Sequence, residues 1–546
     1  MCSFIASTLA LLFRLQHINF YLKLRGPDYT GSRTHGGFEY VHNLLHMTGS
    51  FTPQPFASAD NRTVALFNGE IYNYRKLQAV LRPQGPPYRS DGECILEAYA
   101  RWGARFARHF EGEFAVAVFD LKKQRIVAVT DPFGVKPLFV AQTDDAFGVS
   151  SYRSGLLRAG HEASSISQLP ANHIHVYAYA LESDKPKGFT LARTHAIMQW
   201  SLQQHKQDAD AWATAFEEAV RVRTEGAFRG VFLALSSGYD SGAIHLAMLR
   251  LGVPHATYSI VGAENRDDQR ILRQRVAFAE SYHRKRAGQE EAQKQQTQQS
   301  EGPRVSGSNL GSYIVRVNGS TYRQTHRWLS QHCEPYRYAL PVFSKPSLGA
   351  TPSFVPGERL STDEFPLLKD SAAMGVATIC TLAKARGQLT MLTGSGADET
   401  MTDYGFNGVR FATHSQFGGR FPNDTALQRL FPWADFYGGS QRAYLAKDEY
   451  VTGAFGVEGR FPFLDTRVVQ EQLWLAADLK NKYYKAASQL YMQKHGYPHE
   501  PCIASEEHPF GDGPGCKKVG FLVPQRKRKI GATSGCVGPA CKPHFE

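Results

Sequence analysis

The sequence predicts an α/β protein built from two domains in series. Two observations carry this prediction: the first two hundred residues are rich in short apolar runs between turns, and the later residues alternate helical periods with buried strands. A chain of 546 residues also exceeds what a single hydrophobic core usually organises. We therefore expect a layered sheet domain followed by a parallel α/β domain.

Short strands are predicted along the chain up to about residue 195. The runs of Val, Ile and Phe between Gly, Pro and Asp are typical of strands in a layered sheet. No positive charge precedes the apolar stretch 4–13, which is too short to span a bilayer, so we interpret it as a buried strand or helix. The predicted strands are 63–67, 114–120, 125–129 and 173–179.

Helical periodicity begins at 209–223, and buried strands are predicted at 231–235 and 388–392. This alternation indicates a parallel sheet whose strands end in loops at one edge.

The domain boundary is expected between residues 184 and 207, which gives domains at 2–195 and 196–525. A segment at about 284–310 is rich in Gln, Glu, Lys and Ser and too polar to bury, so we interpret it as an exposed or disordered insertion. Residues 526–546 form a basic tail that contains Gly and Cys.

Composition and charge exclude several classes of protein. Hydrophobic residues make up 42% and charged residues 21%, as in globular proteins. The net charge of +12 is scattered, and its densest cluster, 526–529, lacks interleaved aromatics, which argues against a nucleic-acid site. The eight cysteines form no CxxC pair, so we expect a reduced, cytoplasmic protein without a membrane segment.

A phosphate-binding loop is predicted after the strand at 231–235. The Ser/Gly-rich turn 236–242 leads into an Ala/Ile/Leu-rich helix, so backbone N–H groups and hydroxyls converge at the positive end of the helix dipole. The spacing is neither that of a Walker loop nor GxGxxG. The turn resembles the SGGxDS loop of ATP pyrophosphatases, with Ser237 in place of the first glycine; an ordinary strand–turn–helix junction is the alternative.

Cys2 follows the initiator methionine, so removal of Met1 would leave a cysteine with a free α-amine. An α-amine with a pKa of roughly 7.7 to 8 can take the proton of a thiol with a pKa of about 8.5. Asn68 and Gly69 offer two donors for an oxyanion at a predicted strand end. Glu70 and Asp91 offer carboxylates for an α-ammonium group.

Two ordered sets of motifs carry a family resemblance. The first is similar to the class II glutamine amidotransferase domain, and it consists of Cys2, RGPD at 25–28, NGEIYN at 68–73, Ser90–Asp91 and DPFGVKPL at 131–138. The second is similar to the synthetase half of the asparagine synthetase family, and it consists of the phosphate loop and the runs 393–399 and 458–465. The resemblance covers about 2–525, apart from the polar insertion. It implies an N-terminal-nucleophile αββα sandwich that hydrolyses glutamine, joined to an ATP-pyrophosphatase α/β domain that adenylates a carboxylate.

The resemblance also implies roles for individual residues. Cys2 is the nucleophile, Lys482 stabilises the α-phosphate or the tetrahedral intermediate with Lys485 as its rival, and Glu458 is the nearest acidic partner of that lysine. Glutamine is held by Asn68, Gly69, Glu70 and Asp91. ATP is held by Leu235, Ser236, Gly238, Asp240, Ser241, Ile260, Thr393 and Gly394. Mg²⁺ is held by Asp240 and Asp398, whose carboxylates alone would repel the charge of ATP.

Three departures from the family pattern involve four positions. Leu44 stands where the arginine for the glutamine carboxylate is expected, and Ser395 stands where the family has a glutamate beside the acyl-adenylate. Ser237 replaces a loop glycine and Tyr239 an aliphatic residue, which the turn tolerates if φ stays negative.

Three hypotheses about function follow. The first is an ATP-dependent, glutamine-hydrolysing amide synthetase, most simply one that makes asparagine from aspartate through an acyl-AMP, with a homodimer left open. The second is a lactam- or amide-forming synthetase that uses an amine of its own substrate. The third is a regulatory or RNA-associated protein without turnover.

Overall fold

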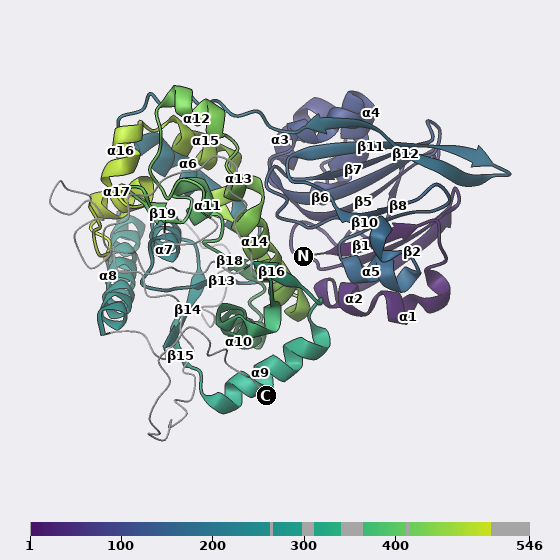
Figure 1. Ribbon diagram of the computed structural model, residues 1–546. Coiled ribbons are helices and arrows are strands. Elements are labelled where there is room, and N and C mark those ends of the chain that lie inside the picture. The colour runs from purple at the N-terminus through teal and green to yellow at the C-terminus, as the bar shows by residue number, and fades with distance from the viewer. Residues whose placement is uncertain (1, 262–265, 297–310, 340–363, 411–414, 504–546) are drawn as a thin grey trace, which may run out of the picture.

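The computed structural model describes residues 2–261, 266–296, 311–339, 364–410 and 415–503, and they form two domains that lie side by side (Figure 1). The N-terminal domain ends with a strand at Ala196, and the first helix of the second domain begins at Asp210. Within these described ranges, no helix combines the length and apolar character needed to cross a membrane.

Two six-stranded antiparallel sheets, packed face to face, build the N-terminal domain. The first sheet has the order β10 (Ile166–Gln168), β8 (Phe139–Gln142), β9 (Phe147–Ser150), β1 (Ser3–Ser7), β3 (Phe38–Leu44), β2 (Tyr29–His35). The second has the order β12 (Lys185–Ala196), β11 (His173–Glu182), β7 (Arg125–Thr130), β6 (Gly112–Asp120), β5 (Thr63–Ile71), β4 (Phe56–Ala57).

Helices cover both outer faces of this sandwich, which confirms the αββα expectation (Figure 1). One outer layer holds α1 (Leu15–Ile18), α2 (Phe20–Arg25) and α5 (Arg153–Ala159); the other holds α3 (Tyr74–Leu81) and α4 (Cys94–Trp102).

The apolar run in β6 is explained by burial on both of its faces. Alternate residues point to opposite sides of a sheet, so Phe119 packs between the two sheets while Phe114 packs under the helices. The ring of Phe119 lies 5.0 Å from that of Phe38 and 5.0 Å from that of Tyr40, both on β3. The sequence of a strand that is buried on both faces is a continuous apolar run, without the alternation of apolar and polar residues.

The second domain is built on a five-stranded parallel sheet, as predicted. In sheet order its strands are β15 (Gly311–Arg316), β14 (His255–Val261), β13 (Val231–Ala234), β18 (Thr390–Leu392) and β21 (Glu458–Arg460). Leu233 of β13 is in register with Leu392 of β18, so the loops that follow these strands leave the same edge side by side. Two further antiparallel pairs of short strands lie in this domain: β16 (Arg337–Ala339) with β17 (Glu364–Pro366), and β19 (Gly405–Phe406) with β20 (Val409–Arg410).

Helices cover both faces of the parallel sheet. Phe232 faces one cluster with α9 (Gly319–His332), α10 (Ser371–Lys384) and α14 (Gly439–Phe455). Leu233 faces the other with α6 (Asp210–Thr224), α7 (Tyr239–Leu251) and α17 (Ala486–Lys494). The remaining helices are α8 (Arg266–Gln296), α11 (Ala397–Met401), α12 (Asp424–Leu430), α13 (Ala434–Tyr437), α15 (Thr466–Trp474) and α16 (Ala477–Lys482).

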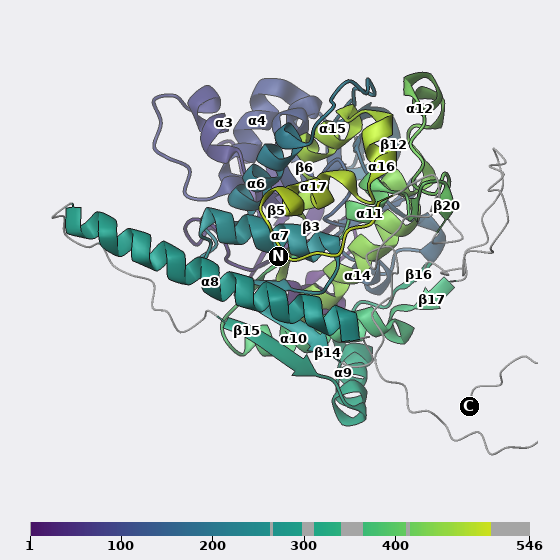
Figure 2. The same cartoon turned by 90° about the vertical axis from the view of Figure 1, so that its left-hand side faces the viewer.

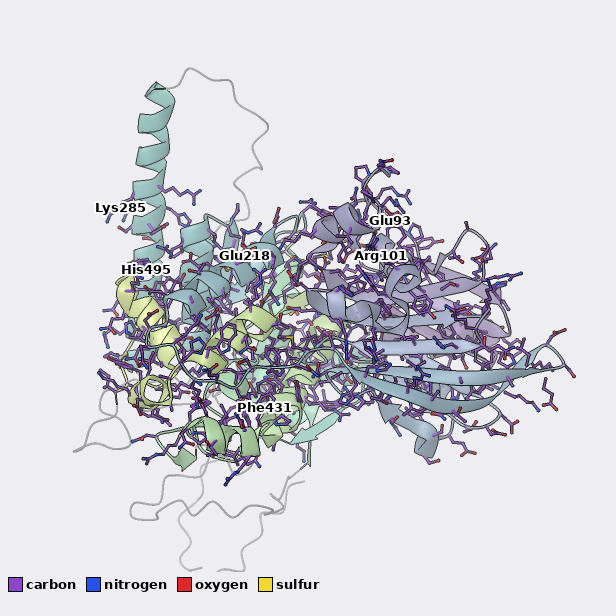
Figure 3. The ribbon with its side chains drawn as sticks, turned by 90° about the horizontal axis from the view of Figure 1, so that it is seen from above. Glu93, Arg101, Glu218, Lys285, Phe431 and His495 are labelled. Carbon is purple, nitrogen blue, oxygen red and sulfur yellow. The ribbon has the colours of Figure 1, made fainter. Side chains whose placement is uncertain are left out.

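The polar segment expected at 284–310 is helical in its first part, so the disordered alternative does not hold there. Residues 284–296 continue α8, whose C-terminal half projects from the body of the domain (Figure 2). Lys285 lies near the point beyond which the helix leaves the body of the domain (Figure 3). Residues 297–310 and 526–546 lie outside the described residues.

In the described part of the chain, four cysteines are free thiols and one is not. Cys2, Cys94, Cys333 and Cys380 are buried free thiols. Cys502 is disulfide-bonded, so the expectation of a reduced chain does not hold at that position.

Candidate functional site

The first site is a cavity around Cys2, just before β1. The Cys2 side chain is buried, its Sγ lies 3.7 Å from the Leu45 carbonyl, and Arg25 Nε donates to the Cys2 carbonyl at 3.0 Å. The cavity is lined by Cys2, residues 44–48, Ser50, Thr52, Gln54, Phe56, Phe67, Gly69, Glu70, residues 90–92 and Glu458.

Burial raises the pKa of Cys2 to about 11, although the positive amino terminus of the chain acts to lower it. The side chain is therefore a thiol at neutral pH. A nucleophile in this place needs a neighbouring base, and the α-amine exposed by removal of Met1 is such a base.

Gly69 lines the cavity near the end of β5, and Asn68 precedes it in the strand. Gly69 adopts a φ of +130°, and a Cβ there would lie 1.9 Å from the Glu113 carbonyl, so only glycine fits. Both side-chain amide atoms of Asn68 are buried and have no hydrogen-bond partner among the residues that the structure describes. A buried, unsatisfied amide is costly, and a polar ligand would satisfy it.

Glu70 and Asp91 place two carboxylates on the cavity wall. Burial raises the pKa of Asp91 to about 7, although the N–H of Ile71, 2.8 Å from its Oδ2, opposes the shift. Burial also raises the pKa of Glu70 well above its ordinary value; Arg460 opposes this shift, and Glu458 adds to it. An ammonium group entering the cavity would favour the charged form of both.

Leu44 and its neighbours form one wall of the cavity. Leu44 lines the cavity, and no arginine is among the described residues that do so. His46 is also on this wall, and its backbone N–H donates a hydrogen bond to Asp28 Oδ2 at 2.8 Å.

Glu458 lies in this first site, which corrects its predicted place beside the synthetase lysine. It lines the Cys2 cavity and accepts from Arg460 Nε at 2.6 Å. Burial acts to raise the pKa of Glu458, but the amino terminus, Arg460 and Lys136 outweigh it and hold the pKa well below its usual range. Arg460 also contacts Glu70 at 3.1 Å, so β21 of the second domain completes the cavity of the first.

The second site begins at the turn between β13 and α7. Ser241 Oγ lies 2.9 Å from Ser236 Oγ and accepts from the Ser236 N–H at 3.0 Å. The N–H of Gly238 donates to Ser236 Oγ at 3.2 Å. These bonds hold a compact turn at the N-terminus of a thirteen-residue helix, where the dipole favours anions.

Arg275 of α8 supports this turn from behind and was missed by the sequence prediction. Its guanidinium is buried and donates to the carbonyls of Ser236 and Gly238. Carbonyls held in this way point away from the side on which the turn's N–H groups lie. No local pattern identifies Arg275, since it lies 37 and 39 positions from the two residues whose carbonyls it binds and sits in a polar helix.

Lys485 joins the two aspartates predicted to act together. Its Nζ lies 2.6 Å from both carboxylate oxygens of Asp240 and 3.0 Å from Asp398 Oδ1. Burial acts to lower the pKa of Lys485, but the two aspartates outweigh it and raise the pKa. Lys482, the residue preferred from sequence, is exposed and lies over the ring of Tyr483, so that prediction was wrong about position.

The two motif loops touch at Gly394. A Cβ on Gly394 would lie 2.6 Å from Asp240 Cβ, which explains why glycine stands there. Leu235 and Ile260 are buried at the ends of β13 and β14, and the Leu235 N–H donates to the Tyr258 carbonyl at 2.9 Å. These residues give the same sheet edge an apolar wall.

The donor set at Asp240 and Asp398 fits Mg²⁺. Their carboxylates converge on one cationic atom, and hard oxygen ligands of this kind suit that ion. No group of three or more His, Cys, Asp or Glu in the described part of the chain could hold a metal. Mg²⁺ commonly binds through one or two carboxylates, with phosphate and water supplying the rest.

Comparisons with known proteins match the N-terminal domain to a described family and the chain to several curated proteins. Residues 1–208 match the family described as a glutamine amidotransferase domain. An asparagine synthetase (glutamine-hydrolyzing) of Triphysaria versicolor is 28% identical over 235 residues, 42% of this chain and 38% of that protein. A putative one of Mycobacterium tuberculosis is 34% identical over 165 residues, 28% of this chain and 25% of that protein.

A longer match extends into the second domain. Putative asparagine synthetase (glutamine-hydrolyzing) 1 of Methanocaldococcus jannaschii is 25% identical over 463 residues, 82% of this chain and 70% of that protein. The matches to the Triphysaria and Mycobacterium proteins, in contrast, span between a quarter and two fifths of their length.

Proposed function

Since the chain belongs to the family of glutamine-hydrolysing asparagine synthetases, we propose that it transfers the amide nitrogen of glutamine to an ATP-activated carboxylate, most simply making asparagine from aspartate. One observation carries the proposal. The cavity around Cys2 is closed by Glu458, and β21, which holds Glu458, pairs with β18, which leads into the Thr393–Asp398 loop of the second site. A transfer between two centres needs such a shared wall.

In the first half-reaction, the Cys2 thiolate attacks the carboxamide carbon of glutamine. The α-amine of mature Cys2 takes the thiol proton and gives one to the departing ammonia. Asn68 and the Gly69 N–H receive the negative oxygen of the tetrahedral intermediate, each worth about a hundredfold or more in rate. Glu70 and Asp91 hold the α-ammonium group. Water then cleaves the thioester and releases glutamate.

In the second half-reaction, a carboxylate oxygen attacks the α-phosphorus of ATP and pyrophosphate leaves. The turn at Ser236, Gly238 and Ser241 binds the phosphates, and Leu235, Ile260, Thr393 and Gly394 enclose the adenosine. Lys485 places a positive charge beside the phosphates. When Mg²⁺ is bound by Asp240 and Asp398, it neutralises triphosphate charge that these carboxylates would otherwise repel.

Ammonia must pass between the two centres without entering bulk water. At pH 7 most free ammonia is ammonium, which is not nucleophilic. The attack of ammonia on the acyl-adenylate forms the amide and releases AMP.

The test is the Cys2→Ala variant, assayed with Mg·ATP and a panel of carboxylic acids by mass spectrometry. Glutamine-dependent amide synthesis should fall at least about a thousandfold, since the nucleophile is gone, while synthesis from added ammonia survives. Cys333→Ala, which removes another buried thiol, is the matched control and should retain both activities. Equal loss of both activities in Cys2→Ala would contradict the division of labour.

Ser395 and Leu44 favour a second candidate within the same family, in which an amine of the substrate replaces ammonia. Under that alternative, pyrophosphate is released without matching consumption of glutamine. Absence of ATP–pyrophosphate exchange with every acid in the panel would instead support a regulatory role without turnover.

A further inference from the structure

Asp448 is a buried carboxylate that reaches the second site from a different element. It lies on α14 and is 3% exposed. Ser395 Oγ donates to its Oδ2 at 2.6 Å, and Thr393 Oγ1 donates to the same oxygen at 2.9 Å. Both hydroxyls belong to the loop that touches Asp240 through Gly394. Asp448 is therefore bound directly to the loop that follows β18.

Its charge environment differs from that of the other two acidic groups at this edge. Asp240 and Asp398 share the Lys485 ammonium at 3.0 Å or less. Asp448 has its ion pair in the described part of the chain with Lys447, whose Nζ is 3.9 Å from Oδ1. Asp448 is thus held at close range by two hydroxyl donors, whereas the other two carboxylates are held by an ammonium.

The loop hydroxyls connect this carboxylate to the open edge of the sheet. Thr393, Gly394 and Ser395 are half-buried, whereas Asp448 itself is enclosed. A group that bonds Ser395 on its exposed side would share the hydroxyl with Asp448. Buried charges are expensive, and they persist where the site needs them.

We propose that Asp448, acting through the Ser395 hydroxyl, accepts the proton of the nitrogen nucleophile when it attacks the activated carboxylate. The inference rests on the proposed function and adds a proton acceptor to it. Asp448 and Ser395 together would supply the carboxylate that a glutamate at position 395 would otherwise provide.

The step balances as a simple substitution. The nitrogen lone pair forms a bond to the carbonyl carbon of the acyl-adenylate. The nitrogen gives a proton to Ser395 Oγ while the Ser395 proton passes to Asp448. The bond between carbon and the AMP oxygen then breaks, and AMP leaves with the electron pair. Asp448 later returns its proton to water.

Two assays on the full-length protein separate this role from adenylation. ATP–pyrophosphate exchange reports adenylation, and amide formation from added ammonia reports nitrogen attack. In Asp448→Asn, which keeps an acceptor for both hydroxyls, we expect exchange within about threefold of wild type and amide formation lower by about a hundredfold. A parallel fall in both rates, or no fall in amide formation, would overturn the proposal.

A second pair of variants tests the carboxylate itself and guards against misfolding of one variant. Asp448→Ser should lose amide formation. The double variant Ser395→Glu/Asp448→Ser places a carboxylate on the other side of the same hydrogen bond, and its rate of amide formation should be at least about tenfold higher than that of Asp448→Ser. If the double variant exchanges pyrophosphate normally but recovers no amide formation, the proposal is wrong. If wild type itself shows no exchange with any acid, the proposed function fails instead.

Discussion

Lys485 shows how one side chain can decide whether two acidic motifs can share a site. It is buried at the start of α17, with φ of +48° in the left-handed region. Two aspartates from separate loops would repel one another in a partly buried place, and the ammonium between them offsets that repulsion. The left-handed backbone aims the side chain at the loop edge, a conformation that costs about 1 kcal/mol or more and persists only when surrounding contacts maintain it.

Replacing Lys485 by Met should therefore damage both stability and adenylation. Removing one partner of a buried ionic cluster leaves the other charges uncompensated, at a cost of about 3 kcal/mol. We expect a lower urea midpoint and at least a hundredfold loss of ATP–pyrophosphate exchange. Lys482→Met, three residues earlier on an exposed position, is the control and should change either quantity little. Similar effects of the two substitutions would contradict a specific role of Lys485 in stability and adenylation.

Asp91 predicts how glutamine binding depends on pH. Its pKa of about 7 is raised mainly by burial, so the neutral form prevails at pH 6 and the charged form at pH 8. Because the charged form attracts the α-ammonium of glutamine, KM for glutamine should fall about tenfold from pH 6 to pH 8. The free energy of unfolding changes in the opposite direction. Because the folded state keeps Asp91 protonated up to about pH 7, this residue's contribution to stability decreases as the pH rises from about 4 to 7.

The control for this pH dependence is Asp91→Asn, measured by the same steady-state assay. It should bind glutamine weakly at every pH and show a nearly flat KM profile. A profile as steep as that of wild type would mean that another group titrates.

At the scale of elements, the meeting of strand ends builds the second site. β13 and β18 are neighbours in register, so the loops after them share one edge even though about 160 residues separate them in the chain. α14 then adds Asp448 from one face of the sheet, and α17 adds Lys485 from the other side. The site thus depends on close approach of loops more than on any one loop.

Gly394→Ala tests this close approach. The new Cβ would lie 2.6 Å from Asp240 Cβ, so the two loops must move apart. We expect exchange activity to fall at least tenfold with little change in the thermal midpoint, since the loop is at the surface edge. Gly319→Ala, at the exposed start of α9 with only the tip of Arg323 nearby at 3.4 Å, should leave exchange intact. Normal exchange in Gly394→Ala would argue that the loops separate on binding.

At the scale of the whole molecule, a buried ionic network joins the domains. Glu449 of α14 accepts from Arg25 at 2.8 Å and from Lys136 at 2.7 Å, both in the N-terminal domain. Arg223 of α6 contacts Glu113 at 2.7 Å. All these side chains are 2% exposed or less. Since Arg25 also holds the Cys2 carbonyl, α14 contacts the surroundings of both sites.

Glu449→Gln should weaken the buried ionic contact between the two domains. It leaves Arg25 and Lys136 with less compensating charge, which in a buried network costs about 3 kcal/mol. We expect the ratio of glutamate to amide formed to rise above one, because ammonia escapes before transfer. The control is Glu225→Gln, at a half-exposed ion pair with Arg75 across the same boundary, where such pairs contribute about 1 kcal/mol or less. An unchanged ratio in Glu449→Gln would contradict this role.

The sequence by itself determined the features that depend on local order. Strand periods predicted β5, β6, β7, β11 and β13, helical periods predicted α6, and the turn after β13 predicted an anion-binding loop. Cys2, the Asn68–Gly69 pair and the two acidic motifs were identified because each is a short pattern of neighbouring residues.

Only the tertiary structure decided which charges are partners. Lys485 rather than Lys482 meets the aspartates, Glu458 belongs to the Cys2 cavity, and Asp448 bonds to Ser395 from 53 positions away in the chain. Local patterns follow from backbone geometry over a few residues. The partner of a buried charge, in contrast, is set by whichever side chains packing brings within a few ångströms, at any separation along the chain.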